Sequence, residues 1–174
     1  MELLAKIFGF AGILSTVVIY QQKTRKGLLF SKLVSDVLWF VHYFCLGAYS
    51  GAAIAVIGLI RELIFMNREK KWAKHPAWLV FFLALSLGSA VLTWKNGFSL
   101  LPMAASMLAV VSFWIGKPKL SRLLSFPIAG SMLVYDVTLN PISVAGIGNE
   151  LLAITSSVVG IIRYDIQKKA GKNS

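Results

Sequence analysis

The stretch at residues 31–66 is mainly apolar but contains Asp36, His42, Arg61 and Glu62. The rest of this stretch is apolar enough to cross a bilayer twice. An ionised side chain at the centre of a bilayer costs about 2.5–3.5 kcal/mol on insertion scales, so these residues indicate a solute or ion path, or paired groups inside a helix bundle. They are the first candidates for chemistry in this chain.

Polar residues also interrupt the apolar runs of the second half, at Asp136, Asn149 and Glu150. We predict that these residues and His42 surround a cavity that binds substrate. Trp39 shares a helical face with His42 and would offer a stacking surface. Other interpretations stay open: His42 fixes helix packing through a hydrogen bond, Trp39 packs against helices or lipid, and Asp136 is a capping or interfacial carboxylate.

Asp36 and Arg61 lie at similar depth on adjacent predicted helices. One interpretation turns Arg61 inward to pair with Asp36, because a buried charge costs less when it is paired. This pair would form an inner gate or a structural ion pair. The other interpretation extends the Arg61 side chain to the cytoplasmic interface. Adjacent residues of a helix point about 100° apart, so Glu62 is not expected to share a partner with Arg61 and has no predicted role.

The composition is that of an integral membrane protein. Of 174 residues, 57% are hydrophobic and 14% are charged, and the mean hydropathy of +0.72 is too high for a soluble domain of average composition. The net charge of +11 comes from short basic stretches between apolar runs, which predicts topology signals and no nucleic-acid binding. Cys45 is the only cysteine, so we predict no intrachain disulfide, no metal site and no cofactor.

Seven apolar runs are long enough to span a bilayer as helices, and they cover residues 3–20, 30–47, 49–66, 77–94, 99–115, 123–139 and 142–164. Fifteen Lys and Arg residues, Lys32 among them, are assigned to one side of these runs and two to the other. The positive-inside rule then places the N terminus outside and the C terminus in the cytoplasm. The sequence therefore predicts an all-α, multi-pass membrane protein with seven transmembrane helices.

The connections follow a repeating pattern. Runs one to three and runs five to seven each have a basic inner loop followed by a very short uncharged outer turn. An offset of about 93 residues superimposes LWFVHYFCLGAYS on SMLVYDVTLNPIS and places Ser50 on Ser143. Two units of the same orientation need an inverting helix between them. This predicts a 3+1+3 parallel repeat, with a first triple-helix unit at 1–67, a basic loop and linker helix at 68–97, and a second unit with a basic tail at 98–174.

This arrangement resembles the SWEET and PQ-loop transporters, and the nicotinamide riboside carriers have the same 3+1+3 plan. The segments DVLWFVHYFCLGAYSGA, IRELIF and NELLAITSSVVGIIRYD more closely resemble the YgjV family of bacterial inner-membrane proteins, over essentially the whole chain. This resemblance implies a multi-pass protein of the bacterial inner membrane and brings no activity with it. In SWEET proteins an asparagine on the third helix of a unit contacts sugar, and Asn149 has that position in the second unit. The SWEET Pro-Gln signature is Tyr20-Gln21 here.

The function predicted from these positions is transport of a small polar solute through a central cavity between the two units. The carboxylates and the histidine favour a solute with amine or cationic groups, or proton coupling. The predicted surroundings are the lipid bilayer, and a homo-oligomer is compatible with the sequence. The alternative is a non-transporting membrane scaffold or partner subunit, because charged pairs also hold helices together. The sequence contains no HExxH, GxSxG or Walker motif, so no enzymatic activity is expected.

Overall fold

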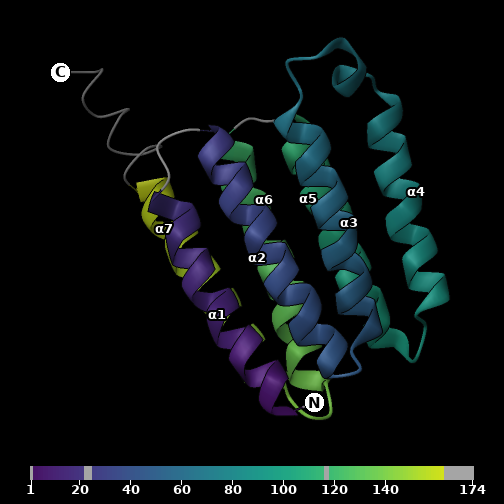
Figure 1. Ribbon diagram of the computed structural model, residues 1–174, viewed down its shortest axis with the longest axis vertical. Helices are drawn as coiled ribbons and strands as arrows, with labels where there is room; N and C mark the ends of the chain where they lie inside the picture. Colours follow the sequence, from purple (N-terminus) through teal and green to yellow (C-terminus); the bar gives the residue numbers. More distant parts are fainter. Residues whose placement is uncertain (1, 22–24, 116–117, 163–174) are drawn as a thin grey trace.

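The computed structural model describes residues 2–21, 25–115 and 118–162. The long helices are α1 (Glu2–Gln21), α2 (Arg25–Cys45), α3 (Tyr49–Met66), α4 (Ala77–Leu92), α5 (Leu100–Ile115), α6 (Pro118–Thr138) and α7 (Val144–Gly160), with the short 3-10 helices η1 (Lys71–Lys74) and η2 (Gly97–Ser99). The described residues contain no β-strand, so the all-α prediction is confirmed. The helices stand side by side in one bundle (Figure 1).

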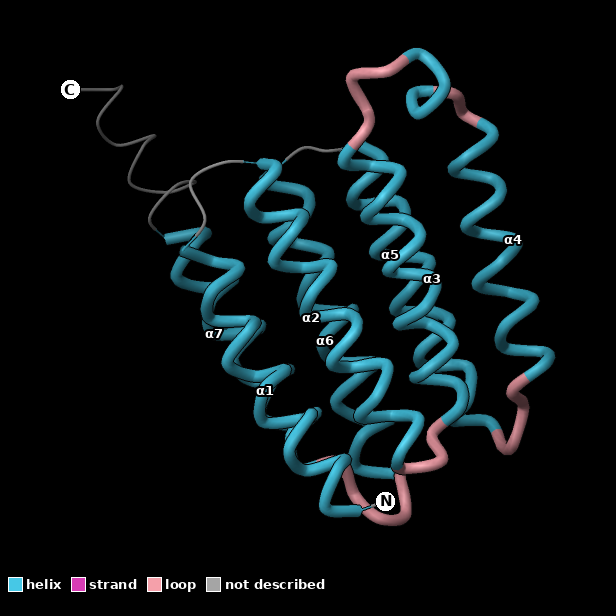
Figure 2. The backbone as a smooth tube through the Cα atoms, viewed as in Figure 1, coloured by secondary structure: helices cyan, strands magenta, loops and turns pink. Residues whose placement is uncertain are grey.

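The helices form two layers that face each other. In one layer α2 packs between α1 and α3, and in the other α6 packs between α5 and α7. Contacts of α1 with α7 and of α3 with α5 join the layers, while α4 packs against α3 and α5 at one edge. The α2–α3 and α6–α7 turns lie at one end of the bundle, which we call the turn side. The α3–α4 connection lies at the opposite end, the loop side (Figure 2).

The helix boundaries agree best with the predicted spans at α3, which has the expected bounds Tyr49–Met66. Helices α2 and α6 begin earlier than predicted, at Arg25 and Pro118. Lys32 falls within the predicted run 30–47 and lies inside α2, so counting it with the basic residues of a loop is wrong. By length and hydropathy alone, Tyr49–Met66 and Gly97–Ile115 qualify as membrane spans, and Ala77–Leu92 and Val144–Gly160 are shorter apolar helices. Residues 163–164 of the last predicted span lie outside the described residues.

The α2–α3 turn is closed by a Schellman motif centred on Gly47. Gly47 has a φ of 67°, which glycine adopts without the steric strain that a side chain would introduce. The Gly47 N–H donates to the Phe44 carbonyl oxygen at 3.0 Å, and the Ala48 N–H donates to the Tyr43 carbonyl oxygen at 2.9 Å. These bonds satisfy the last carbonyl groups of α2 and let α3 start at once.

The α6–α7 turn is built differently. Ser143 precedes α7, and its Oγ accepts the Gly146 N–H at 3.0 Å as an N-cap. Ser50 instead lies inside α3, and its Oγ donates to the Thr93 carbonyl oxygen at 3.1 Å. Helix α6 ends 93 residues after α2, whereas α7 begins 95 residues after α3. The predicted superposition of Ser50 on Ser143 is therefore wrong, because the second turn is longer.

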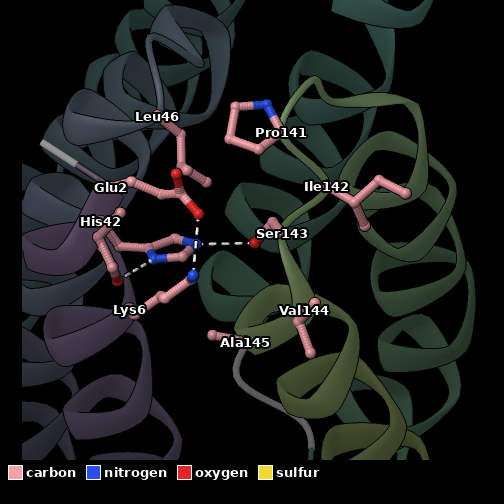
Figure 3. A pocket seen from close by; sticks show the side chains of 10 residues that line it. Glu2, Lys6, His42, Leu46, Pro141, Ile142, Ser143, Val144 and Ala145 are labelled. Atoms are coloured by element: carbon pink, nitrogen blue, oxygen red, sulfur yellow. Dashed lines mark hydrogen bonds and ion pairs between the residues drawn. The ribbon is translucent and has the colours of Figure 1, made fainter.

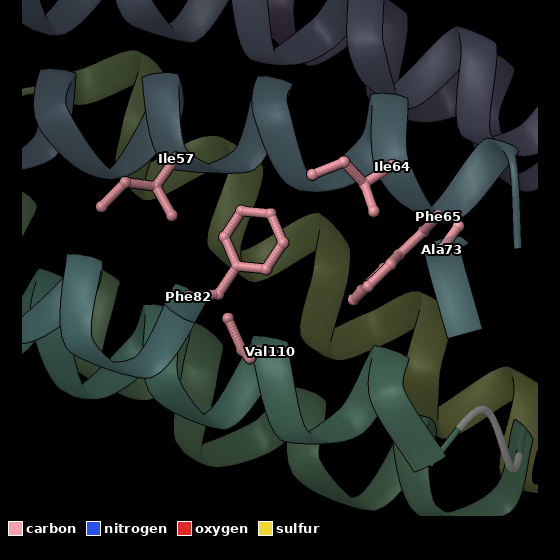
Figure 4. Close-up of a cluster of buried hydrophobic side chains, with 6 residues drawn as sticks. All are labelled: Ile57, Ile64, Phe65, Ala73, Phe82 and Val110. Atoms are coloured by element: carbon pink, nitrogen blue, oxygen red, sulfur yellow. The ribbon is translucent and has the colours of Figure 1, made fainter. Parts of the chain in front are cut away.

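An apolar cluster fastens α4 to the bundle (Figure 4). The Phe82 side chain of α4 is fully buried between residues of α3 and α5, and the cluster consists of Ile57, Ile64, Phe65, Ala73, Phe82 and Val110. The Phe65 and Phe82 rings contact edge to face with centroids 6.0 Å apart. Ser86 of α4 and Ser106 of α5 add a buried hydrogen bond of 2.9 Å.

Candidate functional site

His42 joins three elements at the turn side (Figure 3). Its Nδ1 lies 2.7 Å from the Ala5 carbonyl oxygen of α1, and its Nε2 lies 2.7 Å from the Ser143 Oγ. A carbonyl oxygen only accepts, so Nδ1 carries a proton and donates to Ala5, and Nε2 is hydrogen bonded to the Ser143 hydroxyl group. His42 is 3% exposed. The imidazole therefore links α2 to α1 and to the start of α7.

A small cavity of about 60 Å³ adjoins His42 at the turn side. It lies between α1, α2 and the α6–α7 turn, and Glu2, Lys6, Leu46 and Pro141 also line it (Figure 3). Asp136, Asn149 and Glu150 are not among its lining residues. The four residues predicted to surround one cavity do not all line this cavity. Of the four, His42 lines it and the other three do not.

Asp136 and Tyr43 form a direct link between the two layers. The Tyr43 hydroxyl of α2 donates to Asp136 Oδ1 of α6 at 2.9 Å. Asp136 is 0% exposed, and its Oδ2 has no hydrogen-bond partner among the described residues. A methyl group on Gly146 of α7 would overlap the Asp136 carboxyl group. The carboxylate is therefore fully enclosed, and the interpretation of Asp136 as an interfacial group is wrong.

Asn149 and Glu150 lie deeper on α7 and contact each other. Asn149 Nδ2 donates to Glu150 Oε1 at 3.0 Å, and Asn149 Oδ1 accepts the Thr16 hydroxyl of α1 at 2.7 Å. Glu150 is buried. The side-chain amide of Asn149 is thus engaged at both polar atoms: its oxygen with Thr16 of a neighbouring helix, and its nitrogen with the Glu150 carboxylate. The structure brings these two predicted residues together and adds Thr16 to them.

Four charged side chains meet between α2 and α3, and we call them the charged quartet: Lys32, Asp36, Arg61 and Glu62. Lys32 Nζ lies 3.2 Å from Asp36 Oδ1 and 3.9 Å from Glu62 Oε1. Arg61 Nη2 lies 3.0 Å from Glu62 Oε1. Glu62 is 0% exposed and Arg61 is 5% exposed. Two cations and two carboxylates therefore balance inside the bundle.

Both interpretations of Arg61 need correction. The side chain is buried, with its guanidinium 4.9 Å from the centroid of the Phe113 ring, so it does not extend to the interface. Among the described residues its ion-pair partner is Glu62, and Asp36 pairs with Lys32 instead. The Arg61 side chain is long enough to fold back on its neighbour despite the angle between them. Asp36 and Arg61 nevertheless belong to one network, because both lie against Gly58.

Trp39 is packed within the bundle. It is 8% exposed and belongs to an apolar cluster with Tyr43, Ala48, Ala52 and Tyr135. Its ring contacts the His42 ring edge to face with centroids 5.2 Å apart. A methyl group on Gly12 of α1 would lie 2.8 Å from the indole. Helix α1 therefore covers the indole at this point, and stacking on a solute there remains a prediction.

Sequence reasoning missed several members of these networks. Lys32 stands four residues before Asp36, a spacing that indicates an ion pair on a helix. Tyr43 lies 93 residues before Asp136, which is the offset of the predicted internal repeat. Thr16 and Ser143 are ordinary residues for helix interiors and caps, so the sequence alone gives no signal for their partners.

The comparisons agree with the membrane character of the chain. The family model described as Imp-YgjV, bacterial inner membrane protein, matches residues 3–168. No curated protein and no solved structure matches the chain. The matched region extends over α1 to α7 and therefore includes every polar network described above. This chain belongs to the Imp-YgjV family of bacterial inner membrane proteins.

Proposed function

We propose that this protein carries small polar solutes across the bacterial inner membrane, along a path between its two layers. The observation that carries the proposal is a set of carboxylate oxygens buried in the bundle without a hydrogen-bond partner among the described residues: Asp36 Oδ2, Glu62 Oε2 and Asp136 Oδ2. Buried polar atoms in proteins nearly always have a partner. Ionisable groups within membrane helices are costly and mark solute or ion paths.

The polar contacts follow the length of the bundle, which supports a path of this kind. His42 and the Tyr43–Asp136 link lie at the turn side. The contacts of Asn149 with Thr16 and Glu150 come next, and the charged quartet lies closer to the loop side. A bundle held together by apolar packing alone would need none of these groups. In this conformation they contact one another, so passage of a solute requires the layers to separate.

The proposed architecture is a parallel repeat of three helices, with α4 as the inverting linker. Corresponding positions differ by 93 residues on α2 and α6 and by 95 on α3 and α7, as the first residues of these helices indicate. On this register Lys32 corresponds to Ser125, and Glu62 corresponds to Ser157. Lys32 pairs with Glu62 at 3.9 Å, and Ser125 Oγ donates to Ser157 Oγ at 2.6 Å. The same two positions thus contact each other in both halves.

Residues at the centre of the bundle also support the repeat. Tyr43 and Asp136 correspond to each other and are hydrogen bonded, as expected for residues beside a pseudo-twofold axis. Gly51 packs against the Tyr43 ring, and the corresponding Gly146 packs against the Asp136 carboxyl group. The axis would run along the membrane normal, as in transporters built from parallel repeats. The two halves would then move against each other about the Tyr43–Asp136 link.

Cysteine labelling tests the proposed orientation. In a Cys45→Ala background, Gly97→Cys lies at the turn side, where a side chain meets nothing within 4 Å, and Lys70→Cys lies exposed at the loop side. A membrane-impermeant maleimide added to spheroplasts is expected to label Gly97→Cys at once and Lys70→Cys only after permeabilisation, because the loop side is the more basic. The opposite pattern would reverse the orientation.

Uptake into proteoliposomes tests the function. We expect the purified protein to admit at least one of three labelled probes, glucose, alanine or putrescine, faster than protein-free liposomes do. Glu150→Gln is expected to lower this rate, because Glu150 is a buried carboxylate of the proposed path. Thr155→Ala is the matched control on the same helix, since Thr155 is exposed and donates only to the Leu151 carbonyl oxygen.

Two results would contradict the proposal. The first is no uptake of any probe by protein that is monodisperse and unfolds cooperatively, which would favour a membrane scaffold. The second is an equal rate for Glu150→Gln, Thr155→Ala and the unchanged protein, which would place the path elsewhere.

A further inference from the structure

Asp136 and Glu150 are buried carboxylates that form no ion pair among the described residues, and of the two only Asp136 is fully buried with an oxygen that lacks a hydrogen-bond partner. Asp36 and Glu62 both contact Lys32, and Glu62 also contacts Arg61. Asp136 forms no ion pair within the described residues, and its carboxyl group lies against a phenol hydroxyl, the Ser143 side chain and the backbone of Gly146. A carboxylate enclosed without a counter-ion is strongly disfavoured in a medium of low dielectric constant. The group must then bind a positive charge.

The charged groups of the neighbouring elements do not supply this charge. On α2 the group facing Asp136 is Tyr43, because His42 is engaged with Ala5 and Ser143. On α7 it is Glu150, one turn beyond Gly146 on the same face. The ionisable groups of the other neighbouring segments are these: Glu2 and Lys6 pair with each other on α1, Lys95 near η2 contacts Gly47 and Tyr49, Arg61 and Glu62 pair on α3, and α5 has none.

The space beside Asp136 determines which positively charged ligand can bind there. The Gly146 backbone packs against the Asp136 carboxyl group so closely that a methyl group would not fit between them. The cavity of about 60 Å³ beside His42 does not reach Asp136. A proton needs no cavity, whereas a metal ion or an organic ammonium group needs space for several ligand atoms. A proton is therefore the ligand that fits this site.

We propose that Asp136 is a proton-binding site at the contact between the two halves, and that Tyr43 responds to its protonation. When the carboxyl group is ionised, the Tyr43 hydroxyl donates a charge-assisted hydrogen bond across the layers, which is stronger than a neutral one. When Oδ2 carries the proton, this bond to Oδ1 weakens and the halves separate more readily. The use of this step to couple solute movement to protons rests on the proposed function, but proton binding itself does not.

Infrared spectroscopy of the reconstituted protein over a pH titration tests the site without transport. We expect the carbonyl stretch of a protonated carboxyl group to disappear as pH rises, and Asp136→Asn to remove that component. Tyr43→Phe is expected to keep the component to higher pH, because the ionised form loses its hydrogen bond. Asp36→Asn, the control, is expected to leave it unchanged, since Asp36 pairs with Lys32. Spectra of Asp136→Asn that titrate identically to those of the unchanged protein, or no titrating component in a folded protein, would overturn the proposal.

A transport arm separates this proposal from the proposed function. With a probe that enters proteoliposomes, an inward acid gradient should accelerate uptake by the unchanged protein and not by Asp136→Asn. If no probe enters, the proposed function fails while the infrared result still decides proton binding. If uptake occurs with the same gradient dependence in both proteins, coupling through Asp136 is wrong.

Discussion

Replacement of Arg61 by methionine is expected to lower the free energy of unfolding by about 3–5 kcal/mol, the usual cost of breaking a buried ion pair by removing one partner. Arg61 is the closest cation to Glu62, at 3.0 Å, and Glu62 is 0% exposed. Methionine preserves much of the apolar contact with Phe113 but leaves the quartet with an excess negative charge. Unfolding in mixed micelles with increasing denaturing detergent, followed by tryptophan fluorescence, measures the effect.

Two further variants separate charge balance from packing. Arg61→Met combined with Glu62→Met removes one cation and one carboxylate, so Lys32 and Asp36 again balance, and we expect recovery of most of the lost stability. Arg68→Met is the matched single change, because Arg68 also lies over an aromatic ring, 5.5 Å from the centroid of Trp114. It is half-buried, and the expected loss is below about 1 kcal/mol. A double variant as unstable as Arg61→Met would show that the quartet does not act through its charge balance.

The helix order could be predicted from the sequence because each span is an apolar run bounded by charged or turn residues. The bounds of α3 follow directly from this pattern, since α3 begins after the short turn at Gly47 and ends at Met66. The start of α2 could not be predicted in the same way. The predicted span begins at residue 30 and α2 at Arg25, because Arg25, Lys26 and Gly27 are typical of a basic loop. Lys32, which is counted with the basic residues of the inner side, forms ion pairs with Asp36 and Glu62 inside the bundle. A hydropathy value counts Lys32 as polar and takes no account of the ion pairs that neutralise its charge inside the bundle.

The candidate site was predictable in its residue types and not in its pairings. His42, Asp136 and Glu150 stand out because ionisable groups are rare in membrane helices. Their partners are a carbonyl oxygen, a tyrosine and an asparagine, which are common in any helix. The Arg61–Glu62 contact illustrates the limit, because a rule based on helix angle excludes it and a flexible side chain permits it. Pairing depends on side-chain reach and on how the layers meet, and neither can be obtained from spacing along one helix.

Replacement of Gly146 by alanine is expected to lower the free energy of unfolding by about 1–3 kcal/mol, the usual cost of overpacking a close contact. The new methyl group would overlap the Asp136 carboxyl group. The clash can be relieved in two ways. Helix α7 shifts away from α6, or the carboxyl group turns and loses its hydrogen bond with the Tyr43 hydroxyl. Gly148→Ala is the matched control on the same helix, because its methyl group would lie 3.5 Å from Ile13 Cδ1, an ordinary contact. We expect that variant to be unchanged or stabilised by up to about 1 kcal/mol.

The source of the Gly146→Ala effect can be checked by removing the group with which the methyl clashes. Asp136→Ala makes room beside Gly146, so the double variant should lose less stability than the sum of the two single variants, by about 0.5–3 kcal/mol. Purely additive losses would mean that the carboxyl group does not limit the approach of α7 to α6. In the proposed repeat Gly146 and Asp136 correspond to Gly51 and Tyr43, and a methyl group on Gly51 would meet the Tyr43 ring, so Gly51→Ala is expected to couple in the same way to Tyr43→Ala. Coupling at both places would show that one close contact, repeated in the two halves, sets the spacing of the helices on which the proton-binding carboxyl group lies.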